Sequence, residues 1–443
     1  MSAKLQAPRG TFDVLPADWI ARSALIDVAA NNLFHRAAYG RIETPTFEDT
    51  TLFARGVGES TDVVSKEMYS FTDQGDRSLT LRPEGTAPIC RSYIEHGMHK
   101  LPQPVKLWYS GPFFRQEAPQ AARFRQFFQI GCEALGSDEP AVDAESITLL
   151  RDLIEAAGVS DYRLRLSSLG SRAERATYGD ELKAFLRANE SDLAPDVAAR
   201  IDQNPLRAFD AKHDGTQAVM AQAPLLLDHI NQADRDHLGE VKAMLDAVGV
   251  SYQIDPTLVR GLDYYTRTVF EFTSDLLGAQ SGLGGGGRYD GLVQMLGGQP
   301  TPAVGWAAGI ERILTAAQAG LAEATGHTTP DADVYVALED GASKTTAFAL
   351  TQALRNSGLR VELELAGRSI KGQLKAAARV RASHVVITGG ERGTYDVALK
   401  QMANSAQLDV TAGSIAELAA QLCKRIQADK ALPANSKPQG DSQ

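Results

Sequence analysis

Polar and apolar residues alternate along residues 125–135 (RQFFQIGCEAL) with the period of two that is typical of a β-strand. The same pattern predicts a preceding strand over 105–117 (VKLWYSGPFFRQE) and a loop over 118–124. Period two places Gln129 and Glu133 on one face of the second strand and the apolar residues on the other. A solvent-exposed polar face is the ordinary explanation for one strand taken alone. The arginines and turns nearby favour a pocket lined by Gln129 and Glu133.

Residues 258–292 (LVRGLDYYTRTVFEFTSDLLGAQSGLGGGGRYDGL) combine an arginine, two adjacent tyrosines and four consecutive glycines. Val269, Phe270 and Phe272 favour a strand, with Glu271 between the two phenylalanines, and the residues after the glycines are expected to return as a second strand. Glycines at a strand end let the backbone approach a ligand closely. A flexible glycine linker is the alternative, but linkers are not usually flanked by aromatic strand residues and an RYDGL turn. We therefore predict a ligand-facing hairpin.

The other segments before residue 325 mix helices and strands. A loop over 8–16 leads into a helix that Asp18 is expected to cap and Gly40 to end. Residues 171–249 are mostly helical and are interpreted as an insertion, because strand patterns resume at Tyr252. The remaining predicted elements are an extended segment at 41–47, a hairpin over 68–81, a turn at 81–88, a helix over 140–158, a strand at 161–166, and a strand or glycine turn that runs into a helix over 303–314.

The composition changes at about residues 322–331, which predicts a linker at 326–331. Strands and helices then alternate over 332–427, with strands at 333–338, 359–365, 384–389 and 395–400 and a last helix at 414–427. This alternation predicts a mostly parallel sheet with right-handed crossovers. The polar residues 428–443 are expected to be disordered.

The composition and charge of the chain indicate which class of protein it belongs to. A chain of 443 residues that is 43% hydrophobic and 23% charged is an ordinary globular protein of two or three domains. Its net charge of −10 argues against coating nucleic acid over the whole surface, although a local basic surface remains open. Cys90, Cys132 and Cys423 are widely spaced and odd in number, which indicates reduced thiols in a cytoplasm. The N-terminus has no apolar signal segment, and no stretch is long enough to span a membrane.

Several blocks of the chain resemble the histidyl-tRNA synthetases, which are class II aminoacyl-tRNA synthetases. The resemblance runs nearly end to end, and the blocks stand in the family's order. They are PRGTFDVLP, a motif-1-like segment around RIETPTFE, LRPEGT, a motif 2 made of FRQE and RFRQFFQIGCEALG, the histidine-specific pair VRGLDYYTRTVFEF and SGLGGGGRYDGL, and GIERI as motif 3. FRxE or GxER alone is weak evidence, but the complete ordered set is specific.

The resemblance implies an α/β fold of the α+β kind. Residues 1–325 would form a class II catalytic core on an antiparallel sheet, with 171–249 as its helical insertion. Residues 332–427 would form an α/β anticodon-binding domain. The implied activity is ligation of L-histidine to tRNA(His) through histidyl-adenylate, with ATP as a substrate, Mg²⁺ accompanying ATP, and a homodimer as the working form.

The family's site residues map onto this chain. The adenylate step needs mainly positioning and charge cancellation, which the planar arginine fork supplies well. By resemblance, the α-phosphate and histidine carboxylate are bound by Arg115 and Arg260, the γ-phosphate by Arg312, and the rest of the nucleotide by Arg123 and Glu117. The resemblance also implies that Glu84, Thr86 and Gln129 bind the histidine ammonium. Glu133 and Tyr264 would bind the two imidazole nitrogens. Tyr265 would form part of the pocket wall. A lone arginine is normally a surface ion pair, but apolar strand and helix residues flank Arg115 and Arg312.

Three positions depart from the family's pattern. Ala118 and Ala122 remove a basic and a glycine position from the motif 2 loop, and Phe128 stands where histidine is common. Because this loop normally touches the tRNA acceptor end, the departures bear on acceptor contacts and not on the adenylate step.

Two alternatives to a synthetase for histidine are disfavoured by the sequence. A catalytically silent paralogue serves as a regulatory subunit in histidine biosynthesis, but it lacks the anticodon-binding domain and erodes the RGLDYY block. A class II synthetase for another amino acid is disfavoured by Glu133 together with Tyr264.

A basic helix face is predicted in the last domain. Lys371, Lys375 and Arg379 are spaced by four residues and therefore share one face. An ordinary solvated face and a surface that contacts the tRNA backbone are both open.

Overall fold

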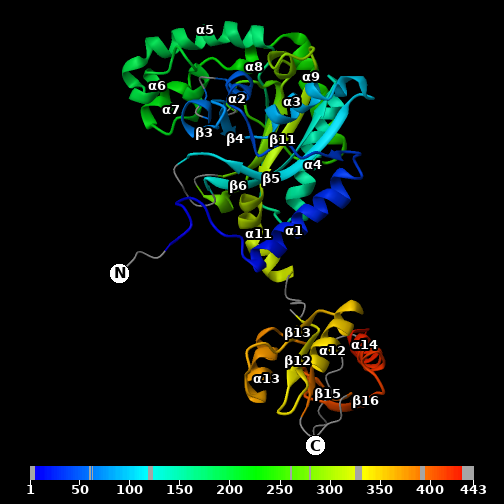
Figure 1. Cartoon of the computed structure of the whole chain (residues 1–443). Coiled ribbons are helices and arrows are strands. Elements are labelled where there is room, and N and C mark those ends of the chain that lie inside the picture. The colour runs from blue at the N-terminus through cyan, green and yellow to red at the C-terminus, as the bar shows by residue number, and fades with distance from the viewer. Residues whose placement is uncertain are drawn as a thin grey trace, which may run out of the picture. The chain divides into compact units, whose positions relative to one another are not determined.

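The computed structural model describes residues 5–58, 61, 63–117, 123–259, 262–278, 281–324, 332–389 and 395–431. The chain divides after Ala324 into two compact units (Figure 1). Each unit has its own sheet and its own hydrophobic core. No helix within the described ranges is long and apolar enough to cross a lipid bilayer.

The first unit is built on a large sheet that is antiparallel at its centre. Within the described residues it has eight strands in the order β1-β5-β6-β11-β10-β9-β7-β8. The two edge strands, β1 and β8, are parallel to their neighbours, and the other pairs are antiparallel. The strands are β1 Gly40–Arg41, β5 Val105–Phe114, β6 Gln126–Leu135, β7 Arg163–Ser168, β8 Gln253–Ile254, β9 Thr266–Thr273, β10 Gly282–Arg288 and β11 Ala303–Gly309.

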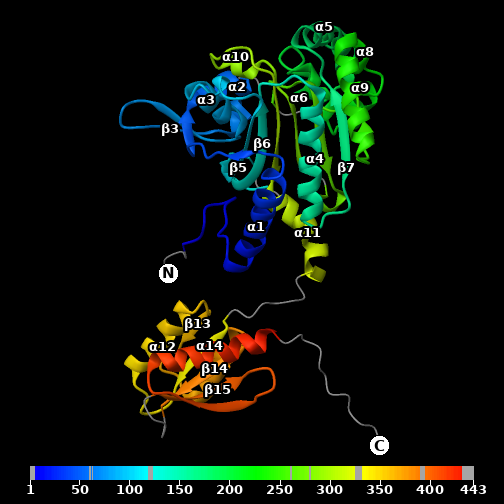
Figure 2. The ribbon, with the colours of Figure 1, turned by 90° about the vertical axis from the view of Figure 1, so that its right-hand side faces the viewer.

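One face of this sheet is covered by helices that bury the apolar side of the strand alternation. Ile130 and Cys132 of β6 and Trp306 of β11 pack there against Ile147 and Leu150. Figure 2 shows α4 lying lengthwise along the sheet. The covering elements are α1 Pro16–Val28, its continuation η1 Ala29–Phe34, α4 Pro140–Ala156, α9 Gln232–Ala247 and α11 Ile310–Ala324. The opposite, more polar face is therefore available for a site.

The opposite face is bordered by smaller elements and by the helical segment 172–247 without its last helix, α9, which lies on the first face. Tyr109 and Phe113 of β5 pack with α3 and α10 on this side. The bordering elements are α2 Thr50–Val57, η2 Val63–Glu67, α3 Thr86–Glu95, η3 Met98–Lys100, α10 Leu292–Met295, and a small sheet of β2 Phe47–Asp49, β4 Ser78–Leu81 and β3 Tyr69–Thr72. The short helix η6 Asp275–Leu277 lies on the first face, where it packs against α11. The helical segment contains α5 Arg172–Ala188, η4 Glu190–Asp192, α6 Pro195–Ala198, η5 Pro205–Asp210, α7 Asp214–Met220, α8 Leu226–His229 and α9.

The second unit holds a mixed sheet in the order β13-β12-β14-β15-β16. β12 is parallel to β13 and β14, whereas β15 and β16 join antiparallel. The expectation of a mostly parallel sheet is therefore only half right. The elements are β12 Val334–Leu338, α12 Lys344–Asn356, β13 Val361–Leu363, α13 Ile370–Arg379, β14 His384–Thr388, β15 Asp396–Gln401, β16 Gln407–Thr411 and α14 Ile415–Ala431. β16 escaped prediction because Val410 alone among its residues is buried.

Some predicted boundaries are wrong. α1 begins at Pro16, which suits a first helical turn, so Asp18 lies inside that turn and does not cap the helix. Gly40 begins β1 and does not end the helix, which stops at Phe34. Residues 428–431 belong to α14, whereas the predicted linker and the rest of the predicted tail lie outside the described residues.

Candidate active site

The site begins with small residues at matching positions on three neighbouring strands. Tyr109 of β5 pairs with Gly131 of β6, which pairs with Ala307 of β11. Ala307 pairs in turn with Gly285 of β10, which pairs with Glu271 of β9. Because paired residues project to the same face, the sheet is hollow between the Tyr109 and Glu271 side chains. The glycines form the strand β10 themselves, and the expected returning strand does not follow them.

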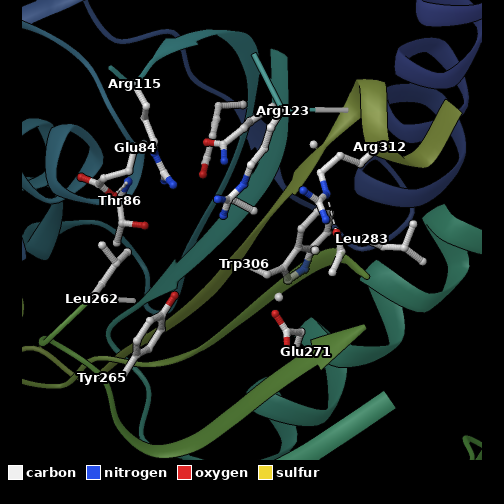
Figure 3. A pocket seen from close by; sticks show the side chains of 18 of the residues that line it. Glu84, Thr86, Arg115, Arg123, Leu262, Tyr265, Glu271, Leu283, Trp306 and Arg312 are labelled. Atoms are coloured by element: carbon white, nitrogen blue, oxygen red, sulfur yellow. Dashed lines mark hydrogen bonds between the residues drawn. The ribbon is translucent and has the colours of Figure 1, made fainter. Parts of the chain in front are cut away.

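A cavity of about 250 Å³ lies over this hollow. Figure 3 shows charged side chains at both of its ends. Its lining consists of Glu84, Gly85, Thr86, Tyr109, Arg115, Arg123, Gln129, Leu262, Tyr264, Tyr265, Glu271, Gly282, Leu283, Gly284, Gly285, Trp306, Ala307, Gly309 and Arg312.

Three arginines line one part of the cavity, with Arg123 between Arg115 and Arg312 (Figure 3). Arg115 Nε donates to the Pro83 carbonyl at 3.0 Å, and Arg123 Nη1 lies 2.8 Å from Glu117 Oε2. Burial lowers the pKa of Arg312 and the nearby charge of Arg123 lowers it further, whereas the carboxylates of Glu271 and Glu117 act in the opposite direction. Cations held this close together favour a polyanion, whose charge would offset their mutual repulsion.

The lining next to Arg115 is polar and largely buried (Figure 3). Glu84 accepts hydrogen bonds from the backbone amides of Thr86 at 2.7 Å and Ala87 at 3.0 Å, and burial raises its pKa. The hydroxyl of Tyr109 and Oε1 of Gln129 are buried without a hydrogen-bond partner among the described residues. Both residues line the cavity, so a polar ligand there could satisfy these two atoms.

Glu133 lies directly behind this polar end. It is fully buried and does not line the cavity, although the register places it on the same face as Gln129. Its carboxylate accepts hydrogen bonds from the Thr86 hydroxyl at 2.8 Å and the Tyr289 hydroxyl at 2.6 Å. Burial raises the pKa of Glu133 to about 8 despite these hydrogen bonds, which lower it. Glu133 therefore lies behind the lining residue Thr86, and its contact with a ligand stays a prediction.

An aromatic wall closes the side of the cavity next to Leu262. The rings of Tyr264 and Tyr265 lie 4.8 Å apart, and Tyr289 meets Tyr264 edge-on at 5.6 Å. Tyr264 and Tyr289 are nearly fully buried, which raises the pKa of both phenols. Their hydroxyls remain neutral donors at physiological pH.

The structure brings most of the predicted residues together. The lining includes Glu84, Thr86, Arg115, Arg123, Gln129, Tyr264, Tyr265 and Arg312. Glu117 lies outside the lining and contacts Arg115 and Arg123. Arg260 and the loop positions Ala118 and Ala122 lie outside the described residues.

Tyr109 and Glu271 are among the lining residues that sequence reasoning missed. The signal for Glu271 was present, because period two turns it away from the apolar side of β9, where Phe270 and Phe272 are buried. Tyr109 has no such local signal, since its position is set by pairing with Gly131.

The predicted basic residues of the second unit lie together on one helix. Lys371, Lys375 and Arg379 are exposed on α13, whose opposite side buries Gln373 and Ala377. These three cations form an exposed basic face, which we call the α13 basic face.

Comparison with known proteins agrees with this architecture. Residues 10–313 match the family described as histidyl-tRNA synthetase, and residues 333–422 match an anticodon binding domain. A histidine--tRNA ligase of Mycolicibacterium vanbaalenii is 47% identical over 428 residues, covering 95% of this chain and 99% of the relative. One from Thermosynechococcus vestitus is 45% identical, covering 91% and 94%.

Solved structures give the same result. An apo histidyl-tRNA synthetase of S. aureus superposes with a TM-score of 0.75 at 34% identity, covering 92% of this chain and 97% of that one. A protein of Bacillus halodurans described as an ATP phosphoribosyltransferase regulatory subunit/histidyl-tRNA synthetase shares the fold, with a TM-score of 0.64 at 21% identity over 88% of this chain and all of that one.

Proposed function

The chain belongs to the histidyl-tRNA synthetase family, and from that premise we propose that it joins L-histidine to tRNA(His), consuming ATP and releasing AMP and pyrophosphate. The observation that carries this proposal is one cavity in which arginines lie beside buried polar acceptors. A reaction between a triphosphate and an amino acid needs both kinds of group side by side.

The reaction has two steps. An oxygen of the histidine carboxylate attacks the α-phosphorus of ATP, the bond to the bridging oxygen breaks, and pyrophosphate leaves. A hydroxyl of the terminal tRNA ribose then attacks the histidyl carbonyl, and AMP leaves with the electron pair of the anhydride bond. In-line displacement of this kind depends on positioning and on cancelling charge at oxygen.

We assign the phosphate part of the cavity to its arginines. Arg115 holds the α-phosphate against the histidine carboxylate, and its Nε bond to Pro83 orients the guanidinium. Arg312 binds the γ-phosphate, and Arg123 with Glu117 contacts the rest of the nucleotide. Arg260 is assigned, by family resemblance, to the opposite side of the α-phosphate. The repulsion between Arg123 and Arg312 supports this assignment, because a bound triphosphate would relieve it.

The polar part is assigned to the amino acid. Glu84, Thr86 and Gln129 accept or position the α-ammonium, and the unpartnered Gln129 Oε1 supports this role. Tyr264 addresses the imidazole, with Tyr265 as the wall. Glu133 binds the second imidazole nitrogen. Because Glu133 lies behind Thr86, its carboxyl group must give up its hydrogen bond with Thr86 or Tyr289 when histidine binds. An apolar amino acid would leave these polar groups unpaired, which supplies discrimination.

Mg²⁺ enters with ATP. Among the described residues no group of three or more His, Cys, Asp or Glu side chains is placed to hold a metal ion. This suits a cation that takes most of its ligands from phosphates and water. Glu271 offers a carboxylate in the lining, and the bound ion would neutralise part of the triphosphate charge.

The tRNA contacts the α13 basic face through its backbone, and the protein works as a homodimer. Exposed Phe47 and Phe71, whose rings meet at 6.2 Å on the small sheet beside the motif 1 segment, support a partner surface there. Three unpaired cysteines support a reducing, cytoplasmic setting.

Amino-acid-dependent ATP–pyrophosphate exchange with all twenty amino acids tests the function. Exchange is expected with histidine and with no other amino acid. Absence of exchange would favour the catalytically silent regulatory relative. That alternative is not favoured now, because relatives matched over at least 94% of their length are named histidine--tRNA ligases.

A further inference from the structure

The segment Leu262–Tyr265 carries the aromatic wall of the cavity, yet it is a turn outside any strand or helix. Leu262, Tyr264 and Tyr265 line the candidate active site on one side. On the other side the segment borders two more cavities of about 300 and 350 Å³. The two tyrosine side chains are buried, but the backbone of the segment belongs to no helix or strand, so its carbonyls depend on other donors.

Arg175 of α5 supplies two of those hydrogen bonds. Its Nη1 donates to the carbonyl of Tyr265 at 2.5 Å, and its Nη2 donates to the carbonyl of Asp263 at 3.2 Å. The guanidinium therefore bridges two carbonyls on either side of Tyr264. Asn204 Nδ2 adds a long contact of 3.4 Å to Asp263 Oδ1, and Asp263 N donates to the carbonyl of Val57 at 3.3 Å.

The position of Arg175 is costly for a cation. It follows the capping box of Ser171 and Glu174 in the first turns of α5, where the helix dipole disfavours positive charge. Burial lowers its pKa, and the charge of Arg172 lowers it further, while Asp263 opposes both effects. Helix stability does not explain an arginine here, whereas the two carbonyls of the wall do.

We propose that Arg175 is a positioning residue through which the helical segment 172–247 sets the shape of the histidine side of the active site. The planar fork holds the carbonyls of Asp263 and Tyr265 at a fixed separation, and this fixes the direction in which Tyr264 and Tyr265 enter the cavity. The inference rests on the proposed function, because it assigns the tyrosine wall to histidine. In this proposal Arg175 does not itself contact the substrate.

The test compares Arg175→Ala and Arg175→Lys with the wild-type full chain in ATP–pyrophosphate exchange. Arg175→Ala is expected to raise KM for histidine about tenfold or more while KM for ATP stays within about twofold. Arg175→Lys is expected to restore only part of the loss, because an ammonium lacks the rigid fork. Arg187→Ala is the matched control, since Arg187 lies at the other end of the same helix and pairs with Glu190 and Asp202.

Calorimetric titration of histidine without ATP gives a readout independent of catalysis and should show the same loss of affinity. An unchanged KM for histidine, an equal rise in both KM values, or full rescue by lysine would overturn the proposal. If Arg175→Ala does not fold, the KM ratio of Arg175→Lys decides the question in the same way. Failure of the proposed function is distinct, because the wild-type chain would then show no histidine-dependent exchange.

Discussion

The hydroxyl of Thr86 donates a hydrogen bond of 2.8 Å to Oε1 of Glu133, which joins the start of α3 to the C-terminal end of β6. Thr86 faces the cavity, whereas Glu133 is fully buried and also accepts from Tyr289. A ligand that touches Thr86 is therefore one hydrogen bond away from a carboxyl group whose pKa is about 8. The protonation of this carboxyl links folding and ligand binding to pH.

Glu133→Gln tests that link. The folded pKa of Glu133, about 8, lies above its usual 4.5, so the folded state retains a proton that the unfolded chain releases. This stabilisation is complete below about pH 4.5 and is lost as pH rises through about 8, by at most about 1.4 kcal/mol per pH unit. We expect the urea midpoint of the wild type to fall more steeply between about pH 6 and pH 8.5 than that of Glu133→Gln. Parallel curves for the two proteins would contradict the buried, protonated state.

Gly305→Ala tests how tightly the floor of the site is packed. A Cβ at Gly305 would lie 1.7 Å from Glu133 Oε2 and 2.5 Å from the Cys132 carbonyl, so the strands or the carboxylate must move. We expect a loss of roughly 1–3 kcal/mol in the free energy of unfolding, with weaker histidine-dependent exchange. Gly239→Ala is the control, because its Cβ meets nothing within 4 Å on α9. That variant should gain up to about 1 kcal/mol, and equal effects at the two positions would refute the packing argument.

Arg312→Gln separates the two parts of the cavity. Removing a cation that the structure holds beside Arg123 should weaken binding of the triphosphate and leave the polar part intact. We expect KM for ATP to rise about tenfold or more and KM for histidine to stay within about twofold. Arg163→Gln serves as a control, since Arg163 pairs with Asp275 in an exposed position outside the lining. A larger change in KM for histidine than for ATP would reverse the assignment.

Local pattern predicted the fold well where one face of an element is buried. The hairpin of β5 and β6, helix α4 and the strand β11 that runs into α11 all lie where alternation or helical spacing placed them. Prediction failed where the signal is weak or not local. β16 buries only Val410, and β10 is made largely of glycine, a residue depleted in strands.

The sequence predicted which residues meet at the site better than it predicted how they are arranged there. Period two brought Gln129 and Glu133 to one face, and the register confirms that shared face. This alternation does not predict how deeply each side chain is buried, because burial depends on the neighbouring strands. Gly305 and Thr86 come from distant parts of the chain, and together they enclose Glu133. Contacts between strands far apart in sequence therefore decided what the local pattern left open.

The α13 basic face provides the last prediction. Lys371 and Lys375 are exposed on the side of α13 away from its buried contacts, so replacing them leaves the packing of the second unit intact. The double variant Lys371→Glu with Lys375→Glu is expected to weaken tRNA binding by at least about tenfold, because it removes two phosphate contacts and adds repulsion.

The variant should leave ATP–pyrophosphate exchange unchanged, since exchange requires no tRNA. The matched control replaces Lys424 and Arg425 with glutamate on α14, where both are exposed. It makes the same change of charge in the same unit, so a general electrostatic effect would weaken tRNA binding equally in both variants. Filter binding across a range of salt concentrations measures the difference. The Lys371 and Lys375 variant should also show a shallower salt dependence, because fewer counterions are released when the tRNA binds. An unchanged dissociation constant would show that this face is merely solvated.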